Sequence, residues 1–293
     1  MTTIRICALL CSFNRKDATL RCLEGVARER EVLRARGGEL CAVLVDDGST
    51  DGTAELVGAR HDWVRVIRTR EPLFWCRSMH LAQQQPEARA ATHQWLLNDD
   101  VDLRPGVLTA LLDTEAALRS QGEGPLVVVG ATADVRTGLT SYGGERRGSG
   151  WRRSRFEQLT PGAQPLLCDG MNGNIVLLPR DALARVGDLD PVFEHAMGDT
   201  DYALRARALG VGVWLAPGHW GWCSDNPPTG TYLDPALPWP QRWRHMLSRK
   251  GLPWRSWLHF TRRHMGLAWP LYFAWPYAKL LSQALRRRGG RHG

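Results

Sequence analysis

Short apolar runs alternate with segments of helical periodicity along most of this chain, and this alternation limits the folds available to it. The apolar runs are residues 4–11, 40–45, 64–67, 94–97, 126–131, 175–178 and 211–215. Strands that alternate with helices favour a mainly parallel sheet covered by helices. We therefore predict an α/β fold with a Rossmann-like sheet. Residues 142–155, rich in Gly, Arg and Ser, are predicted to form a mobile loop.

Polar residues follow several of these runs, most abruptly at Asn98-Asp99-Asp100. An open α/β sheet binds its ligands beside the carboxyl ends of its strands. Adjacent carboxylates repel each other unless they are solvated or neutralised, and a divalent cation shared with a phosphate is a common neutraliser. The alternative is a solvated turn that caps the next helix. Taken alone, this stretch is compatible with both interpretations.

Length and cysteine content restrict the class of protein. The chain has 293 residues, of which 43% are apolar, which is enough for a full hydrophobic core. Its seven cysteines form no Cys-x-x-Cys pair, so we expect a reducing, cytoplasmic location rather than a disulfide framework. The apolar run at the N-terminus is too short for a signal peptide, and we expect no membrane-spanning helix.

Basic residues are concentrated at the C-terminal end. From residue 235 to residue 293 there are twelve Lys or Arg and no Asp or Glu, which leaves 26 basic and 30 acidic residues elsewhere. This segment also carries Trp239, Trp243, Trp254, Trp257, Trp269 and Trp275. We therefore predict a sheet-bearing domain at residues 1–234, with the regular alternation ending at Pro227-Pro228, and a helical extension at residues 235–293.

The mixture of tryptophan and cations predicts that this extension lies on an anionic membrane surface. Residues 267–285 are apolar, but Pro270, Pro276 and Lys279 interrupt them. A second interpretation is that the extension packs on the first domain or forms a dimer. Nucleic-acid binding uses similar side chains, but it does not require the acidic strand ends, so we do not expect nucleic acid as a partner.

Four motifs occur in a fixed order. They are Ser12-Phe13-Asn14-Arg15, Val45-Asp46-Asp47-Gly48-Ser49-Thr50-Asp51-Gly52-Thr53, Asn98-Asp99-Asp100, and Gly198-Asp199-Thr200-Asp201 ahead of Arg205. In this order and spacing, residues 4–226 resemble family 2 of the inverting, nucleotide-sugar-dependent glycosyltransferases, which have the GT-A fold. The resemblance implies a UDP-sugar or dTDP-sugar donor and Mn²⁺ or Mg²⁺ as cofactor.

Donor-binding side chains are expected at the strand ends. They are Ser12, Phe13, Asn14, Arg15, Asp47, Arg77, Asn98 and Asp99. Asp47 can accept a hydrogen bond from a pyrimidine N3–H, whereas Asp46 or Ser49 suits a helix cap. Asp100 matches the metal-binding residue of the family, and Asn98 replaces the first Asp of its Asp-x-Asp motif. For Arg77, a solvated helix face is an equal alternative.

The resemblance places the catalytic base at Asp199, with Asp201 as its rival. Gly198 stands where the family usually has Glu, and Asp201 also suits a first-turn carboxylate favoured by the helix dipole. Asn172 and His195 are candidates for acceptor binding, although a turn residue and a core histidine are the bland alternatives. His219 is the candidate for a further metal ligand, with Cys223 as its competitor, and each also suits a buried structural role.

These residues predict transfer of a sugar to a hydroxyl of a lipid-linked or polysaccharide acceptor at the inner face of the cell membrane. Residues 73–82 resemble relatives that use dTDP-linked 6-deoxyhexoses such as rhamnose. The departures at Asn98 and Gly198 leave open a non-catalytic relative that retains the fold. The sequence does not indicate an oligomeric state.

Overall fold

The computed structural model describes residues 3–224 and 229–289, with side chains up to residue 283. The expected break at Pro227-Pro228 lies outside the described residues. The side chains of Arg286, Arg287 and Arg288 lie outside them as well.

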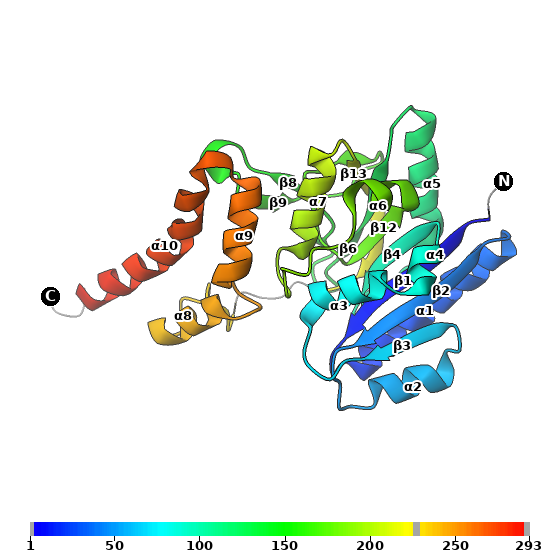
Figure 1. The fold of residues 1–293 in the computed structure, drawn as a ribbon, viewed down its shortest axis with the longest axis horizontal. Helices are drawn as coiled ribbons and strands as arrows, with labels where there is room; N and C mark the ends of the chain where they lie inside the picture. The colour runs from blue at the N-terminus through cyan, green and yellow to red at the C-terminus, as the bar shows by residue number, and fades with distance from the viewer. Residues whose placement is uncertain (1–2, 225–228, 290–293) are drawn as a thin grey trace.

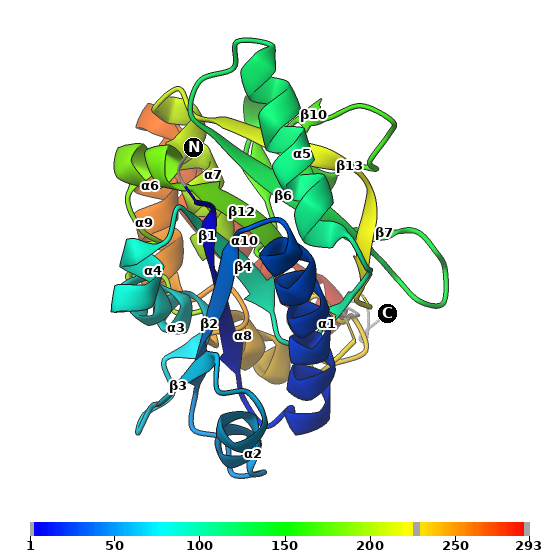
Figure 2. The ribbon, with the colours of Figure 1, turned by 90° about the vertical axis from the view of Figure 1, so that its right-hand side faces the viewer.

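A ten-stranded sheet forms the centre of the described chain (Figures 1 and 2). Its main path runs β10-β13-β6-β12-β4-β1-β2-β3, with β5 beside β13 and β7 beside β6. The strands are β1 Arg5–Ser12, β2 Glu39–Asp46, β3 Val64–Arg68, β4 His93–Asn98, β5 Asp102–Leu103, β6 Leu126–Ala133, β7 Thr140–Tyr142, β10 Leu166–Leu167, β12 Ile175–Pro179 and β13 Gly212–Trp222. Strands β3, β2, β1 and β4 are parallel, whereas β12 runs antiparallel to both β4 and β6. The predicted fold class is confirmed.

Helices cover both faces of this sheet. They are α1 Lys16–Ala35, α2 Thr53–Arg60, α3 Phe74–Gln83, α4 Pro86–Ala90, α5 Val107–Ser120, α6 Arg180–Val186 and α7 Gly198–Ala208. Figure 2 shows α1 and α5 on the face turned to the viewer. Helices α3, α4, α6 and α7 contribute to a separate apolar cluster on the opposite face.

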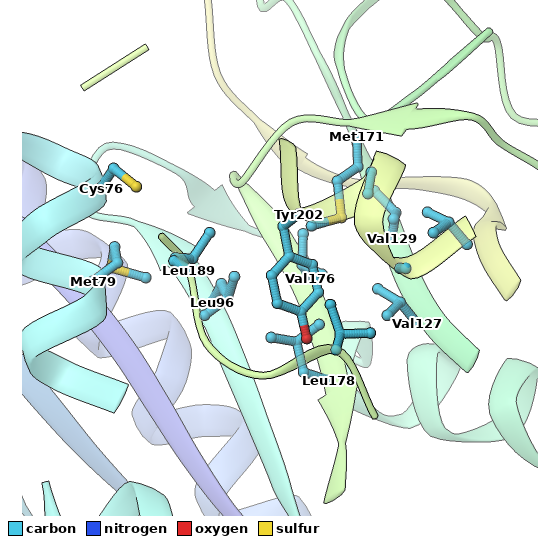
Figure 3. Close-up of a cluster of buried hydrophobic side chains, with 14 of the residues drawn as sticks. Cys76, Met79, Leu96, Val127, Val129, Met171, Val176, Leu178, Leu189 and Tyr202 are labelled. Carbon is cyan, nitrogen blue, oxygen red and sulfur yellow. The ribbon is translucent and has the colours of Figure 1, made fainter. Parts of the chain in front are cut away.

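The centre of strand β4 is apolar and is buried on both faces of the sheet. Successive side chains of a strand point to opposite sides, so Trp95 and Leu97 enter one cluster while Leu96 enters the other. In the second cluster, Tyr202 of α7 lies beside Val176 of β12 (Figure 3). This burial fixes β4 in the middle of the sheet and places Asn98 at its carboxyl edge.

The prediction of a loop at residues 142–155 was wrong. These residues include part of β7, strand β8 (Gly144–Arg147) and the short helix η1 (Gly150–Arg152), and β8 pairs with β9 (Phe156–Gln158) and β11 (Gly170–Met171) in a second sheet. The glycines serve close packing here. A Cβ atom on Gly144 would lie 2.3 Å from Cys168 Sγ, so only glycine lets β8 approach this side chain.

The C-terminal extension is helical. It contains α8 (Trp239–Leu247), α9 (Trp254–His264), η2 (Gly266–Ala268) and α10 (Trp269–Gly289). Figure 1 shows α9 lying near α7, while α10 runs away from the sheet. Trp257 and Phe260 of α9 are buried and belong to the same apolar cluster as Tyr202 of α7. Among the described helices, none has an apolar stretch long enough to cross a membrane.

A buried ion cluster joins α9 to α7. The Asp201 carboxylate, fully buried, accepts hydrogen bonds at 2.8 Å from Arg205 Nε, Arg263 Nη1 and His264 Nε2. Burial alone would raise the pKa of Asp201, but the hydrogen bonds from His264, Arg205 and Arg263 and the charge of Arg205 lower it overall. Asp201 therefore acts as the buried counter-ion that holds the extension against the sheet domain.

We predict that Asp201→Asn lowers the free energy of unfolding by about 3 kcal/mol, because an amide leaves the surrounding cations buried without their counter-charge. Asp181→Asn is the matched control, since Asp181 pairs with Arg119 at a partly exposed site and should cost at most about 1 kcal/mol. Urea unfolding of both variants measures the difference. Equal stability of the two variants would contradict the structural role of the Asp201 cluster.

Candidate active site

The carboxyl ends of β1, β2 and β4 meet at one edge of the sheet. Ser12 is aligned with Asp46 in β2, and Cys11 is aligned with Asn98 in β4. Parallel pairing thus brings together three motifs that are far apart in the sequence. The structure confirms that the segments after these strands lie side by side.

Arg15 neutralises the two acids that follow β4. Its Nη1 atom contacts Asp99 Oδ1 at 3.2 Å and also contacts Asp100 Oδ2. Asp99 is buried, and Thr19 donates to its Oδ2 atom at 3.0 Å. Burial raises the pKa of Asp99 to about 6, although the charge of Arg15 opposes this increase. Within the described chain, the guanidinium of Arg15 therefore supplies the positive charge that faces both acids.

The loop after β1 is held against the loop after β2. Asn14 adopts a left-handed conformation (φ 51°), its backbone N–H donates to Ser49 Oγ at 2.9 Å, and its Oδ1 accepts from the Thr50 N–H at 2.8 Å. Ser12 Oγ is buried and bonds Thr19 Oγ1 at 2.7 Å. Phe13 is 54% exposed, so its ring is free to contact a ligand.

Asp47 is buried beneath the segment before α3. Its Oδ1 accepts from the Leu73 N–H at 2.7 Å and from Thr69 Oγ1 at 3.1 Å, and its Oδ2 accepts from the Phe74 N–H at 2.8 Å. Asp46 instead forms the expected turn contact, accepting from the Ser49 N–H at 3.1 Å. A carboxylate has about four acceptor positions, so Asp47 retains capacity for one further donor.

The start of β12 joins Asp199 to the end of β4. The Asn98 N–H donates to the Asn174 carbonyl at 3.1 Å, and the adjacent Gly173 N–H donates to Asp199 Oδ2 at 3.1 Å. Within the described chain, Asn98 Oδ1 is buried without a hydrogen-bond partner. An orphaned acceptor of this kind calls for an explanation, and an unbound ligand is one. The acids after β4 and Asp199 therefore border one site.

Burial raises the pKa of Asp199, although the N–H groups of Thr200 and Gly173 oppose the increase. The preceding residue must be small, because a Cβ atom on Gly198 would lie 2.3 Å from Cys76 Sγ. Cys76 of α3 thus fills the space that a glutamate at position 198 would need. This packing is the physical reason for the glycine at this position.

Glu145 is a further carboxyl group near Asp199, and the sequence analysis missed it. It lies on β8, within the stretch that composition assigned to a loop. Burial raises the pKa of Glu145 to about 7, the Asp199 charge adds to the increase, and a hydrogen bond from Asn172 opposes it. Asn172 Nδ2 donates to Glu145 Oε1 at 3.3 Å, and Asn172 Oδ1 accepts from the Gly143 N–H at 3.1 Å.

His195 lies near Phe74 and near the charges of Arg15 and of Lys250 in the extension. His195 Nδ1 is buried without a partner among the described residues. Burial lowers the pKa of His195 to about 4, with the charges of Lys250 and Arg15 contributing. Arg249 lies 4.7 Å from the ring of Phe74 and pairs with Glu194 at 2.8 Å. The loop between α8 and α9 therefore reaches the site, which the sequence did not indicate.

Arg77 and His219, which were predicted to bind the donor and a metal, contact other parts of the chain. Arg77 Nε donates to the Pro191 carbonyl at 2.9 Å, and its guanidinium pairs with Glu194. His219 Nε2 bonds Thr140 Oγ1 at 2.8 Å, at irregularities in the pairing of β13 with β6. From β13 it is Cys223 that approaches the acids, with Sγ 3.8 Å from Asp100 Oδ1. The geometry thus favours Cys223 over His219 as the neighbour of Asp100.

The family follows from a direct comparison. Residues 7–184 match the sequence profile described as Glycosyl transferase family 2. The chain belongs to this family.

Two curated proteins are similar to this chain in sequence. It is 30% identical over 195 residues to an N-acetylglucosaminyl-diphospho-decaprenol L-rhamnosyltransferase of Mycobacterium tuberculosis, an alignment that covers 59% of this chain and 62% of the relative. It is 28% identical over 188 residues to an uncharacterized protein of Mycobacterium bovis, with 60% and 66% covered. The chain therefore spans less than two thirds of the length of both relatives.

Solved structures show the fold. GalNAc-T7 with UDP, GalNAc and Mn²⁺ has a TM-score of 0.56 at 15% identity, over 84% of this chain and 48% of that chain. Staphylococcus aureus TarS 1–349 in complex with UDP has a TM-score of 0.51 at 11% identity, over 87% and 69%. These neighbours support the GT-A architecture of the family 2 chain.

The acids after β4 could hold a divalent cation that takes its other ligands from a phosphate and from water. No group of three or more His, Cys, Asp or Glu side chains in the described residues is arranged to hold a metal alone. Mg²⁺ commonly takes only one or two carboxylates and completes its shell with phosphate oxygens and water. Asp100, partly exposed, and the orphaned Asn98 Oδ1 offer hard oxygen ligands of this kind.

We predict that Glu145→Gln stabilises the protein at pH 8 but not at pH 4. The folded pKa of Glu145, about 7, lies above its ordinary value of 4.5, so the folded state favours the protonated form. The stabilisation of the folded state by the protonated carboxyl group is fully present below pH 4.5. It is lost as the pH rises through 7 and the group ionises, which lowers the free energy of unfolding by on the order of 1–3 kcal/mol.

Denaturant unfolding at the two pH values measures this effect. Glu157→Gln on the neighbouring strand β9 is the control, because Glu157 is exposed and should show no such pH dependence. Glu145→Gln and the unmodified protein should differ in unfolding free energy by different amounts at pH 4 and at pH 8. The same difference at both pH values would refute the raised pKa of Glu145.

Proposed function

We propose that this chain is an inverting glycosyltransferase that moves a sugar from a UDP-sugar or dTDP-sugar to a hydroxyl of a lipid-linked or polysaccharide acceptor. The observation that carries the proposal is the junction of β4 with β12. There, Asn98 and Asp199 contact the neighbouring residues Asn174 and Gly173. These contacts support a single site that would be bordered by the proposed metal ligand Asp100, two residues after Asn98, and by the proposed base Asp199.

The donor would bind across the ends of β1, β2 and β4. Asp47 would use its remaining acceptor position for the N3–H of uracil or thymine, while the segment from Thr69 to Phe74 stays bonded to it. Ser12, Phe13, Asn14 and the Asn98-Asp99 pair would border the ribose and diphosphate. Arg77 would contribute only if it gave up its bonds to Pro191 and Glu194.

Asp100 would hold Mn²⁺ or Mg²⁺ together with the diphosphate. When bound, the cation would offset the charge that develops on the departing nucleoside diphosphate. Arg15 pairs with both acids and would have to share them or turn toward the phosphates. Either movement keeps the acids neutralised. His219 would join the metal only after leaving Thr140.

Asp199 would act as the general base. Inversion in one displacement requires a base on the acceptor side, which takes the hydroxyl proton as the oxygen attacks the anomeric carbon. A carboxylate whose pKa is raised by burial accepts a proton more readily than an ordinary one. Asp201 is committed to hydrogen bonds from Arg205, Arg263 and His264. Asn172 and His195 would contact the acceptor.

We infer that the donor is a dTDP-linked 6-deoxyhexose such as rhamnose, and that the acceptor is lipid-linked. The similarity to the mycobacterial L-rhamnosyltransferase, whose name specifies a diphospho-decaprenol acceptor, supports this choice. Such an acceptor would place the chain at the inner face of the cell membrane. Hydrolysis of a panel of nucleotide sugars with Mn²⁺ or Mg²⁺ tests the donor, and no turnover with any of them would favour a non-catalytic relative.

We predict that Asp100→Asn abolishes the enhancement of nucleoside diphosphate binding by Mn²⁺, because an amide lacks the negative charge that a hard cation prefers. Titration of UDP and dTDP with and without Mn²⁺ measures this. Asp102→Asn serves as the control, since Asp102 is exposed two residues further along. Undiminished enhancement in Asp100→Asn would remove the metal role from this residue.

We predict that Asp199→Asn binds the donor normally but loses transfer by about two to four orders of magnitude, the usual contribution of a positioned base. The asparagine carbonyl can still accept from the Gly173 N–H, so the local fold should persist. Asp113→Asn on the exposed side of α5 is the control. Transfer by Asp199→Asn at the unmodified rate would show that the base lies elsewhere.

A further inference from the structure

A large cavity lies between the C-terminal extension and the sheet domain. Its volume is about 820 Å³, which is within the range of small-molecule binding sites. Helices α8, α9 and α10 form half of its wall, and the segments before α8, between α8 and α9, around β9 and at the start of α7 form the rest. None of the nucleotide-binding motifs contributes to this wall.

The charge of this cavity is entirely positive. Arg155, Arg242 and Lys279 line it, and no Asp or Glu is among its lining residues. Arg155 and Lys279 are exposed and form no ion pair within the described chain. The cavity therefore presents three cations without a matching carboxylate.

Arg242 is the most informative of these cations. It is only 7% exposed, and its guanidinium donates to neutral acceptors, the Tyr232 carbonyl at 2.8 Å and Gln283 Oε1 at 3.1 Å. In the described part of the chain no carboxylate lies within ion-pair distance of it. Asp234 is close enough for its charge to interact with that of Arg242, but the two form no ion pair. A buried cation whose hydrogen bonds go to neutral groups is costly, and an anionic ligand would lower that cost.

The rest of the wall is apolar and aromatic. Trp257 and Phe260 stack with ring centroids 5.6 Å apart, and Leu280 is buried beside them. Trp275 also lines the cavity but is 66% exposed. On the same helix, α10, Leu271 and Leu281 are exposed as well. An apolar chain inside the cavity would thus continue onto an apolar outer surface.

The cavity also reaches the turn that carries the proposed base. Met197 and Thr200 belong to its wall, and they flank Gly198 and Asp199 at the start of α7. A ligand in the cavity would therefore be held close to Asp199 without occupying the donor site.

We propose that this cavity binds a lipid diphosphate, with the diphosphate at Arg155, Arg242 and Lys279 and the first part of the hydrocarbon chain against Trp257, Phe260 and Leu280. The rest of the chain leaves past Trp275 along α10. The inference rests on the proposed function, because it supplies the binding site of a lipid-linked acceptor. It assigns Arg242 and Lys279 of the extension, together with Arg155, to one ligand rather than to a membrane surface in general.

Binding of farnesyl diphosphate to the full chain, measured by calorimetry in EDTA, tests the proposal. We expect binding at least tenfold tighter than that of inorganic pyrophosphate or farnesol, because each of these lacks one half of the ligand. Saturating UDP should not compete, and Asp100→Asn should bind the probe normally. Competition by UDP, or equal affinity for pyrophosphate, would place the probe in the donor site and overturn the proposal.

The double variant Arg155→Gln/Lys279→Gln should bind the probe at least tenfold more weakly, and both sites are exposed, so the fold should persist. Arg255→Gln is the matched control, because Arg255 is an exposed cation of α9 outside the cavity. Equal binding by the double variant and the control would refute the site. Displacement of the probe by phosphatidylglycerol vesicles should be weaker than displacement by vesicles that bear a polyprenyl diphosphate. Equal displacement by the two kinds of vesicle would assign the cavity to ordinary phospholipid and would also overturn the proposal.

Donor hydrolysis separates this proposal from the proposed function. The double variant should hydrolyse the nucleotide sugar at the unmodified rate, because its cations lie outside the donor site. If the unmodified protein binds the probe through these cations but hydrolyses no donor, the cavity assignment stands and the glycosyltransferase proposal fails. If it hydrolyses donor but the double variant keeps full affinity for the probe, the cavity assignment fails alone.

Discussion

The carboxylates at the end of β4 need neutralisation, and much of the site is arranged around this requirement. Asp99 is buried and Asp100 follows it directly, so the two negative charges must lie close together. Arg15 reaches both acids from the loop after β1 because β1 and β4 are parallel neighbours. The carboxyl end of β2 and the start of β12 lie at the same edge of the sheet. A cation, from the chain or from a bound metal, is therefore built into the geometry of the sheet edge.

Charge neutralisation also explains much of the C-terminal extension. The extension has no acid of its own, whereas the rest of the chain has more acids than bases. Arg263 and His264 pair with the buried Asp201, and Arg249 pairs with Glu194. These pairs join the extension to the sheet domain. Of the extension's other cations, Arg242 and Lys279 line the cavity between the extension and the sheet domain.

The site residues that the sequence located are those attached to strand ends. Asp47, Asp99 and Asp100 could be placed because an apolar run with a polar end shows where a parallel strand ends, and parallel strands end at one edge. Arg77 and His219 were expected near the donor, but their contacts depend on neighbours from distant loops. Glu145 was hidden by a composition typical of loops, because its strand is stabilised by pairing with β9 and β11 rather than by apolar residues of its own.

The sequence by itself determined the α/β class, the order of the strands that carry acids, and the concentration of basic residues at the C-terminal end, since periodicity, strand ends and charge are local properties. Only the tertiary structure decided which carboxylates are free to react. Asp199 and Asp201 are two residues apart on one helix, yet one borders the sheet edge and the other is enclosed by Arg205, Arg263 and His264. Their different roles come from burial and from partners more than sixty residues away, which no local pattern specifies.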